Sequence, residues 1–386
     1  MSFMLALPKI SLHGAGAIGD MVKLVAGKQW GKALIVTDGQ LVKLGLLDSL
    51  FAALDEQQMA YQLFDEVFPN PTEALVQQGY AAYQAARCDY LIAFGGGSPI
   101  DTAKAIKILT ANPGPSTAYS GVGKVKNAGV PLVAINTTAG TAAEMTSNAV
   151  IIDSERQVKE VIIDPNLIPD IAVDDASVML DIPPAVTAAT GMDALTHAVE
   201  AYIGRSTTAS TRADALEAVR LIFENLENAY EHGNNIQARE HMLTAAFLAG
   251  RSFSKSYVGY VHAIAHSLGG QYGVAHGLAN AVILPYFLEE YGDACVPQLA
   301  KLARCVGMVP KHTSDRRAAA SFILWVKEMN RYMQIPEAIK EIRREDIPAL
   351  SKHAAAEGNP LYPVPVLMDA KELAGMYEKI MEKGER

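Results

Sequence analysis

The order of short apolar runs and helix-like stretches restricts the fold of this chain more than any other feature. In the first half the apolar runs lie at 32–38, 59–67, 88–97 and 130–138, with helix-like stretches between them at 75–88 and 99–111. Short strands that alternate with helices of about 10–15 residues are typical of βαβ units, whose strands form a parallel sheet. Two further strand-like runs around a polar turn predict a hairpin over 148–164. The first half is therefore predicted to be an α/β domain.

The pattern changes at the Ile-Pro-Pro sequence of residues 182–184. Beyond it, alternation of period two nearly disappears and long helical patterns dominate, for example at 185–203 and 211–232. A chain of 386 residues is long enough for two domains of about 100–200 residues each. We therefore predict an α/β domain at 1–183 and an all-helical domain at 184–386.

Charge and cysteine content exclude several classes of protein. The chain has 33 Lys and Arg against 42 Asp and Glu, a formal charge of −9, which argues against nucleic acid or an anionic membrane as partner. Its cysteines, Cys88, Cys295 and Cys305, have no C-x-x-C spacing, which favours a reducing compartment. The N-terminus lacks the features of a signal peptide, and no run of about 18 apolar residues predicts a membrane span. We expect a cytoplasmic enzyme.

Histidines and one aspartate repeat at helical spacing in the second half. Asp193 and His197 are four residues apart, as are His262 and His266, and His276 follows near the start of another helix. Residues at i and i+4 share a helix face. Three imidazoles with one carboxylate suit a divalent ion such as iron, zinc, manganese or nickel. The alternative is that these are ordinary polar residues of helices. An H-E-x-x-H protease motif is absent.

A glycine turn, Gly95-Gly96-Gly97-Ser98, follows an apolar run and precedes a helical stretch. Small residues let backbone N–H groups approach an anion, and the helix N-terminus adds its dipole. The turn therefore predicts phosphate binding. Asp101 has the alternative interpretation of an ordinary residue of the first helical turn.

A second glycine turn at 14–19 matches G-x-G-x-x-G and is followed about 20 residues later by Asp38, as in a dinucleotide-binding fingerprint. The competing interpretation is a simple turn before a helix. Asp38 itself ends an apolar run, where it could bind a ribose or serve as a turn or N-cap residue.

Threonines follow the fourth apolar run, at Thr137, Thr138 and Thr141. Hydroxyl groups at the carboxyl end of a strand lie where open α/β sheets bind ligands. Thr141 and Glu144 could instead form a capping box.

Taken together, these motifs resemble those of the iron-containing (group III) alcohol dehydrogenases. The resemblance covers nearly the whole chain and is carried by GGGSPIDTAKAI, INTTAGTAAEMT, AATGMDALTHAVEAY, GYVHAIAHSLGG and HGLANAVILPY, in the order and spacing of the family. It implies a Rossmann-like nucleotide-binding domain, an all-helical second domain and an architecture like that of dehydroquinate synthase. It also implies an NAD-dependent oxidoreductase that interconverts an alcohol or diol and its aldehyde, and we expect a homodimer or higher homo-oligomer.

The resemblance also implies roles for individual residues. His266 would lie beside the metal as a proton relay rather than as a ligand. The ion would be Fe²⁺, with Zn²⁺ as the alternative, and its ligands would be Asp193, His197, His262 and His276. NAD would be bound by Asp38, Asn70, Gly97, Ser98, Asp101, Thr137, Thr138, Thr141, Thr146, Asn148 and Lys159. The fingerprint at 14–19 would then have no part in binding.

Rival interpretations remain within the same superfamily. One is a zinc polyol dehydrogenase of the glycerol type. Another is a metal- and NAD-using lyase of the dehydroquinate synthase type, which would need Lys and Arg near the metal; residues 185–203 contain none.

One departure from the family pattern is Ala275, where relatives often have proline before the last ligand.

Overall fold

The apolar runs of the first half form the strands of one parallel sheet. The structure, a computed structural model, describes residues 5–154, 156 and 158–382. It divides the chain into two units, residues 1–181 and 182–386, two residues before the boundary expected from the sequence. The sheet strands of the first unit are β1 (Ile10–His13), β2 (Lys32–Val36), β3 (Ala60–Phe64), β4 (Tyr90–Gly95), β6 (Leu132–Asn136) and β9 (Ile171–Asp174).

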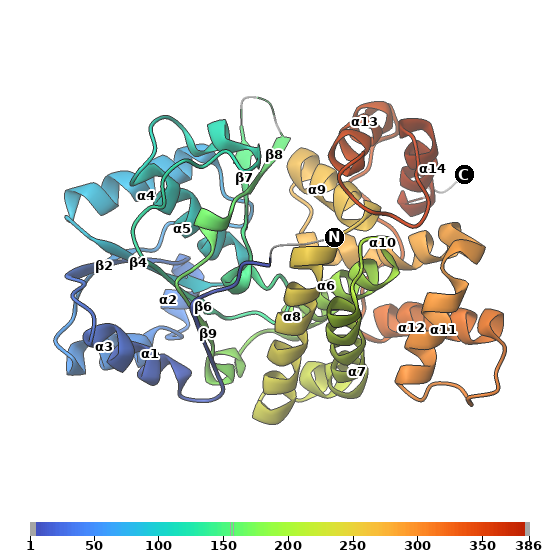
Figure 1. The fold of residues 1–386 in the computed structure, drawn as a ribbon, viewed down its shortest axis with the longest axis horizontal. Helices are drawn as coiled ribbons and strands as arrows, with labels where there is room; N and C mark the ends of the chain where they lie inside the picture. Colours follow the sequence, from blue (N-terminus) through green and yellow to red (C-terminus); the bar gives the residue numbers. More distant parts are fainter. Residues whose placement is uncertain (1–4, 155, 157, 383–386) are drawn as a thin grey trace. The chain divides into compact units, whose positions relative to one another are not determined.

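Helices cover both faces of this sheet, which explains its continuous apolar runs. Every residue of β4 and β6 is buried, as expected for a parallel sheet between two helical layers. In Figure 1, α4 and α5 lie on one face and α1 and α3 on the other. The helices are α1 (Ala17–Ala26), α2 (Gly39–Lys43), α3 (Asp48–Glu56), α4 (Glu73–Ala85) and α5 (Gly97–Leu109).

The strand order determines where the sheet can bind a ligand. Within the described residues the order is β1-β9-β6-β4-β2-β3, with parallel pairing throughout. The chain runs from β2 outward to β3 and then returns to β4 on the other side of β2. Such a reversal leaves a crevice at the carboxyl ends of the two strands, where open α/β sheets bind ligands. Here that crevice lies between β2 and β4.

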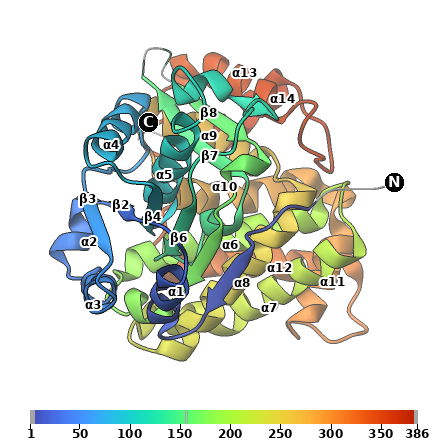
Figure 2. The ribbon, with the colours of Figure 1, turned by 60° about the vertical axis from the view of Figure 1, so that its left-hand side comes forward.

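The hairpin predicted over 148–164 is present. Strands β7 and β8 pair antiparallel, from Asn148 opposite Ile163 to Asp153 opposite Val158. In Figure 2, β7 lies beside α5 of the same unit. The bounds are β5 (Gly121–Val122), β7 (Asn148–Asp153) and β8 (Val158–Ile163).

The second unit is helical, as the sequence predicts. At Gly191 of α6, a methyl group would lie 2.3 Å from Leu226 of α7, so this glycine allows the two helices to pack closely. Across the described residues, no helix is both long enough and apolar enough to span a membrane. The helices are α6 (Pro184–Ile203), α7 (Ala209–Glu231), α8 (Ile236–Ser256), α9 (Tyr260–Tyr272), α10 (His276–Tyr291), α11 (Val296–Cys305), α12 (Asp315–Tyr332), α13 (Ile347–Gly358) and α14 (Ala370–Ile380).

Candidate metal centre and cofactor-binding edge

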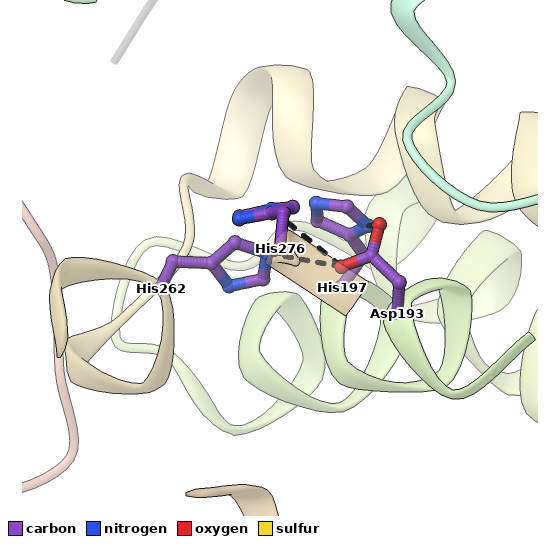
Figure 3. Close-up of side chains that lie close together, drawn as sticks. All are labelled: Asp193, His197, His262 and His276. Carbon is purple, nitrogen blue, oxygen red and sulfur yellow. Dashed lines mark ion pairs between the residues drawn. The ribbon is translucent and has the colours of Figure 1, made fainter. Parts of the chain in front are cut away.

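Four side chains from three helices of the second unit converge on one point (Figure 3). Asp193 and His197 come from one face of α6, His262 from α9, and His276 is the first residue of α10. One potential ligand atom of each lies within 4.8 Å of those of the other three. Helical spacing brings Asp193 and His197 onto one face of α6, and the positions of α9 and α10 add His262 and His276.

Backbone features at the start of α10 allow His276 to reach this cluster. A methyl group at Gly277 would lie 2.5 Å from the carbonyl oxygen of Ala189 on α6, so only glycine lets the two helices approach this closely. Ala275 has φ −60°, close to the value that proline fixes. The turn before His276 therefore has a conformation that proline could also adopt.

The spacing and burial of the four side chains fit a bound divalent ion. Oδ1 of Asp193 is 3.6 Å from Nε2 of His276 and 3.9 Å from Nε2 of His262. A first-row ion with bonds of about 2.0–2.2 Å bridges atoms at such separations. Nε2 of His262 is buried and has no hydrogen-bond partner among the residues that the structure describes. An imidazole nitrogen in this state is poised to bind an ion.

Buried polar neighbours hold the candidate ligands. Nδ2 of Asn280, one turn after His276, donates to Oδ1 of Asp193 at 2.6 Å. Burial raises the pKa of Asp193, and the charge of His262 opposes that rise. Burial lowers the pKa of His262, but its hydrogen bond to Glu200 and the nearby negative charges outweigh burial and leave that pKa raised. A cation at this point would favour the charged carboxylate and neutral imidazoles that metal binding needs.

His266 lies beside the cluster and has a carboxylate partner of its own. Its Nδ1 is 2.6 Å from Oε1 of Glu357, which also accepts a hydrogen bond from the hydroxyl of Tyr362 at 2.7 Å. The rings of His266 and His276 stack with centroids 5.1 Å apart. Because a carboxylate accepts, Nδ1 of His266 carries the hydrogen and Nε2 keeps a lone pair.

In the first unit, the predicted cofactor residues follow the carboxyl ends of neighbouring strands. Asp38 follows β2, Gly97 and Ser98 follow β4, and Thr137 and Thr138 follow β6. The residues that follow β2 and β4, namely Asp38, Gly97 and Ser98, flank the crevice between these two strands. The N-cap interpretation of Asp38 is correct, because its Oδ1 accepts from the amides of Gln40 and Leu41 in α2, at 2.9 and 3.0 Å.

The two glycine turns differ in what lies at their helix N-termini. At 14–19, Oδ2 of Asp175 accepts hydrogen bonds from the amides of Gly16 and Ile18, at 3.0 and 3.1 Å. That carboxylate occupies the place of a phosphate, so this turn is the simple turn before a helix. By contrast, the N-cap residue of α5 is Gly96, which has no side chain, so α5 has no N-cap side chain of its own.

The threonine loop packs against the open glycine turn. A methyl group at Gly96 would lie 3.0 Å from the side chain of Thr138, and one at Gly97 would lie 3.3 Å from that of Thr141. The possible capping box of Thr141 and Glu144 is wrong. Oγ1 of Thr141 accepts from the amide of Ala143 at 3.3 Å, not from that of Glu144, and neither carboxylate oxygen of the fully buried Glu144 has a hydrogen-bond partner among the described residues.

Lys104, which sequence reasoning missed, fixes the segment that contains Thr146 and Asn148. Its buried Nζ donates to the carbonyl and hydroxyl oxygens of Thr146, at 2.9 and 3.1 Å, and to the carbonyl of Asn148, at 2.7 Å. Burial lowers the pKa of Lys104 to about 8. Asp101 also has a structural partner, because its Oδ2 accepts from the amide of Val150 on β7 at 3.1 Å.

Asn70 and Lys159 lie at the opposite end of β7 from Asn148. The loop after Asn70 reaches β7 through a hydrogen bond from the Ile152 amide to the Pro71 carbonyl, at 2.8 Å. On its other side, Ile152 pairs with Lys159 of β8. The predicted cofactor residues therefore form one group at the sheet crevice and a second along the hairpin.

Comparison with known proteins gives the family. The family described as "Iron-containing alcohol dehydrogenase" matches residues 8–176, and its C-terminal counterpart matches 187–381. Alcohol dehydrogenase 4 of Saccharomyces cerevisiae is 40% identical over 351 residues, which are 90% of this chain and 91% of the yeast protein.

Solved structures agree with this. A crystal structure of 1,3-propanediol oxidoreductase has a TM-score of 0.94 at 37% identity and covers 98% of this chain and 100% of its own. Sulfoacetaldehyde reductase from Bifidobacterium kashiwanohense, solved in complex with NAD⁺, has a TM-score of 0.86 at 26% identity and covers 98% of this chain and 99% of its own. With matches over both units, this chain belongs to the iron-containing alcohol dehydrogenase family and is an oxidoreductase of that family.

Proposed function

We propose that this protein interconverts a primary alcohol or diol and its aldehyde by hydride transfer with NAD. The observation that carries the proposal is the convergence of four candidate ligand side chains in the second unit, three of them buried. The names of the similar proteins, an alcohol dehydrogenase and a propanediol oxidoreductase, support this substrate class. The metal ligands in this proposal are Asp193, His197, His262 and His276.

Each part of the chemistry has a separate source. A bound Fe²⁺ or Zn²⁺ supplies Lewis acidity that makes an alcohol more acidic, and NAD supplies the hydride acceptor. His266 takes the released proton on Nε2, since Glu357 holds the hydrogen on Nδ1. Stacking on His276 fixes the plane of the His266 ring.

NAD binds at the sheet crevice of the first unit in this proposal. The uncapped N-terminus of α5 supports placing the pyrophosphate on Gly97 and Ser98. Hydrogen bonds from Lys104 hold the backbone at Thr146 and Asn148 in position. The remaining proposed cofactor residues are Asp38, Asn70, Asp101, Thr137, Thr138, Thr141 and Lys159.

Asp38 is expected to set the preference for NAD over NADP. Its carboxylate can accept hydrogen bonds from ribose hydroxyls, and it repels the 2′-phosphate of NADP. The adjacent Thr37, Gly39 and Gln40 carry no positive charge. Asp38→Gly should therefore lower the ratio of kcat/KM for NAD to kcat/KM for NADP about tenfold, which corresponds to roughly 1.4 kcal/mol. It should also weaken NAD binding. The measurement is kcat/KM for both cofactors in both proteins.

Asp38→Asn is the matched control, because asparagine keeps an N-cap for α2 but removes the charge. It should narrow the preference as Asp38→Gly does, without the loss of the cap. Equal use of NADP by the wild type, or an unchanged ratio in both variants, would show that Asp38 does not bind the ribose.

A substrate screen tests the proposed reaction. Anaerobically prepared, metal-loaded protein should reduce short aldehydes with NADH and oxidise short primary alcohols and 1,3-diols with NAD. Folded, metal-loaded protein that turns over none of these compounds would contradict the proposal. Activity confined to glycerol-like polyols would favour the zinc polyol dehydrogenase.

We also propose a reducing compartment such as the cytoplasm. Support comes from Cys88, Cys295 and Cys305, all of which are free thiols. The expected homo-oligomer stays a prediction.

A further inference from the structure

A carboxylate outside the proposed ligand set contacts one of the ligand histidines, His262. Glu200 lies on α6, three residues after His197, and is 4% exposed. Its Oε2 is 2.6 Å from Nδ1 of His262. Oε2 also accepts from the amide of Gly259 at 2.8 Å, and Oε1 accepts from that of Val261 at 3.0 Å. One buried carboxylate thus has three donors, all from the start of α9.

The contact with Glu200 determines which nitrogen of His262 is available. A carboxylate only accepts, so Nδ1 of His262 must carry the hydrogen. The lone pair is then on Nε2, the atom that faces Asp193 at 3.9 Å. The opposite tautomer would direct an N–H toward the ligand cluster and could not bind an ion.

The fold keeps a specific space for this carboxylate. A methyl group at Gly259 would lie 2.5 Å from Oε1 and 3.1 Å from the carboxyl carbon of Glu200, so a larger residue there would displace the Glu200 carboxylate. The two backbone hydrogen bonds fix the carboxylate plane, and the third then fixes the His262 ring. This is the arrangement in which outer carboxylates orient ligand histidines and strengthen their metal binding.

We propose that Glu200 is the positioning residue of the metal centre: it selects the tautomer and the ring orientation of His262 before a metal ion binds. This role rests on the proposed function, because it requires that His262 is a ligand. Glu200 itself contacts neither substrate nor cofactor.

Substitutions at Glu200 differ in a way that the contacts predict. Alanine removes both acceptor oxygens and, with them, all three hydrogen bonds. Glutamine has one oxygen, which in the Oε2 position keeps the Gly259 and His262 bonds but places an NH₂ group against the Val261 amide. Glu200→Gln should therefore keep the tautomer of His262 but lose part of the contribution that Glu200 makes to metal affinity.

The test is the affinity of metal-free protein for Co²⁺, followed through its visible absorption in competition with a chelator. Glu200→Ala should bind Co²⁺ about 10–100-fold more weakly than wild type, and Glu200→Gln should fall between the two. The melting temperature without metal is measured for each protein, since loss of the α9 contacts also lowers stability.

Tyr260→Phe is the matched control for a purely structural role. It removes hydrogen bonds of the same segment, from the Tyr260 hydroxyl to Asn359 at 2.6 Å and to the Met368 carbonyl at 3.2 Å. It should lower the melting temperature and leave the Co²⁺ affinity unchanged.

The outcomes separate the two proposals. If Glu200→Ala, or Glu200→Leu where the alanine variant fails to fold, binds Co²⁺ as tightly as wild type, the role of Glu200 is overturned and the metal centre stands, because neither side chain can accept the hydrogen bond from His262. A wild-type protein that binds no Co²⁺ would overturn the metal centre itself and this role with it.

Discussion

His276→Ala is expected to lose bound metal and turnover together. Each of the four proposed ligands is irreplaceable, so the loss of affinity should exceed the roughly 10–100-fold effect of removing an outer partner. His276 is the cleaner choice than His262, because its side chain is 24% exposed and the His262 side chain only 2%. Removing His262 would also take away one of the three hydrogen-bond donors to the buried carboxylate of Glu200. Metal content and NADH-linked activity are measured on the same anaerobic preparation.

His353→Ala, an exposed histidine on α13, is the control for the loss of a histidine as such. It should retain metal and activity. A His276→Ala protein with full metal content and full activity would remove His276 from the ligand set.

His266→Ala is expected to lose rate but not metal. General acid–base groups contribute about 10²–10⁴-fold, and kcat should fall within that range. Metal content should stay near that of wild type, because His266 is outside the group of four converging ligand atoms. Added imidazole should restore part of the rate if the missing group is a proton carrier.

Two results would contradict the proton-relay role of His266. A metal loss as large as that of His276→Ala would make His266 a ligand. A rate unaffected by the substitution, with full metal, would leave the ring of His266 without a part in the reaction.

Local periodicity was enough to predict the fold class of each unit, but not the arrangement of the strands. The strands around β4 and β6 are buried on both faces, so their apolar runs are continuous and easy to recognise. The hairpin of β7 and β8 was predictable because its two strands are close together in the sequence. The strand order was not predicted, since it depends on pairings between distant segments such as β1 and β9.

The candidate ligands were predictable for a related reason. Asp193 and His197 share one helix face at i and i+4, which sequence alone reveals. Asn280 stands four residues after His276, so the same rule could have found it. Glu200 and Glu357 could not be paired with their histidines in this way, because 62 and 91 residues separate them along the chain.

The glycine turn at 14–19 shows where a motif alone was insufficient. Its spacing matches a dinucleotide fingerprint, yet Asp175 satisfies its amides from 157–159 residues away. Only the structure shows which helix N-terminus already has its anion. The family resemblance excluded this turn, and the carboxylate of Asp175 supplies the physical reason.

The most direct test of the metal-dependent dehydrogenase is a titration of metal-free protein with Fe²⁺ under anaerobic conditions. NADH formation from the best alcohol of the substrate screen is followed as bound metal is measured, and a parallel titration uses Zn²⁺. We predict that activity is absent without metal and rises with bound ion to a plateau at one ion per chain. Full activity in protein that holds no metal would contradict the account.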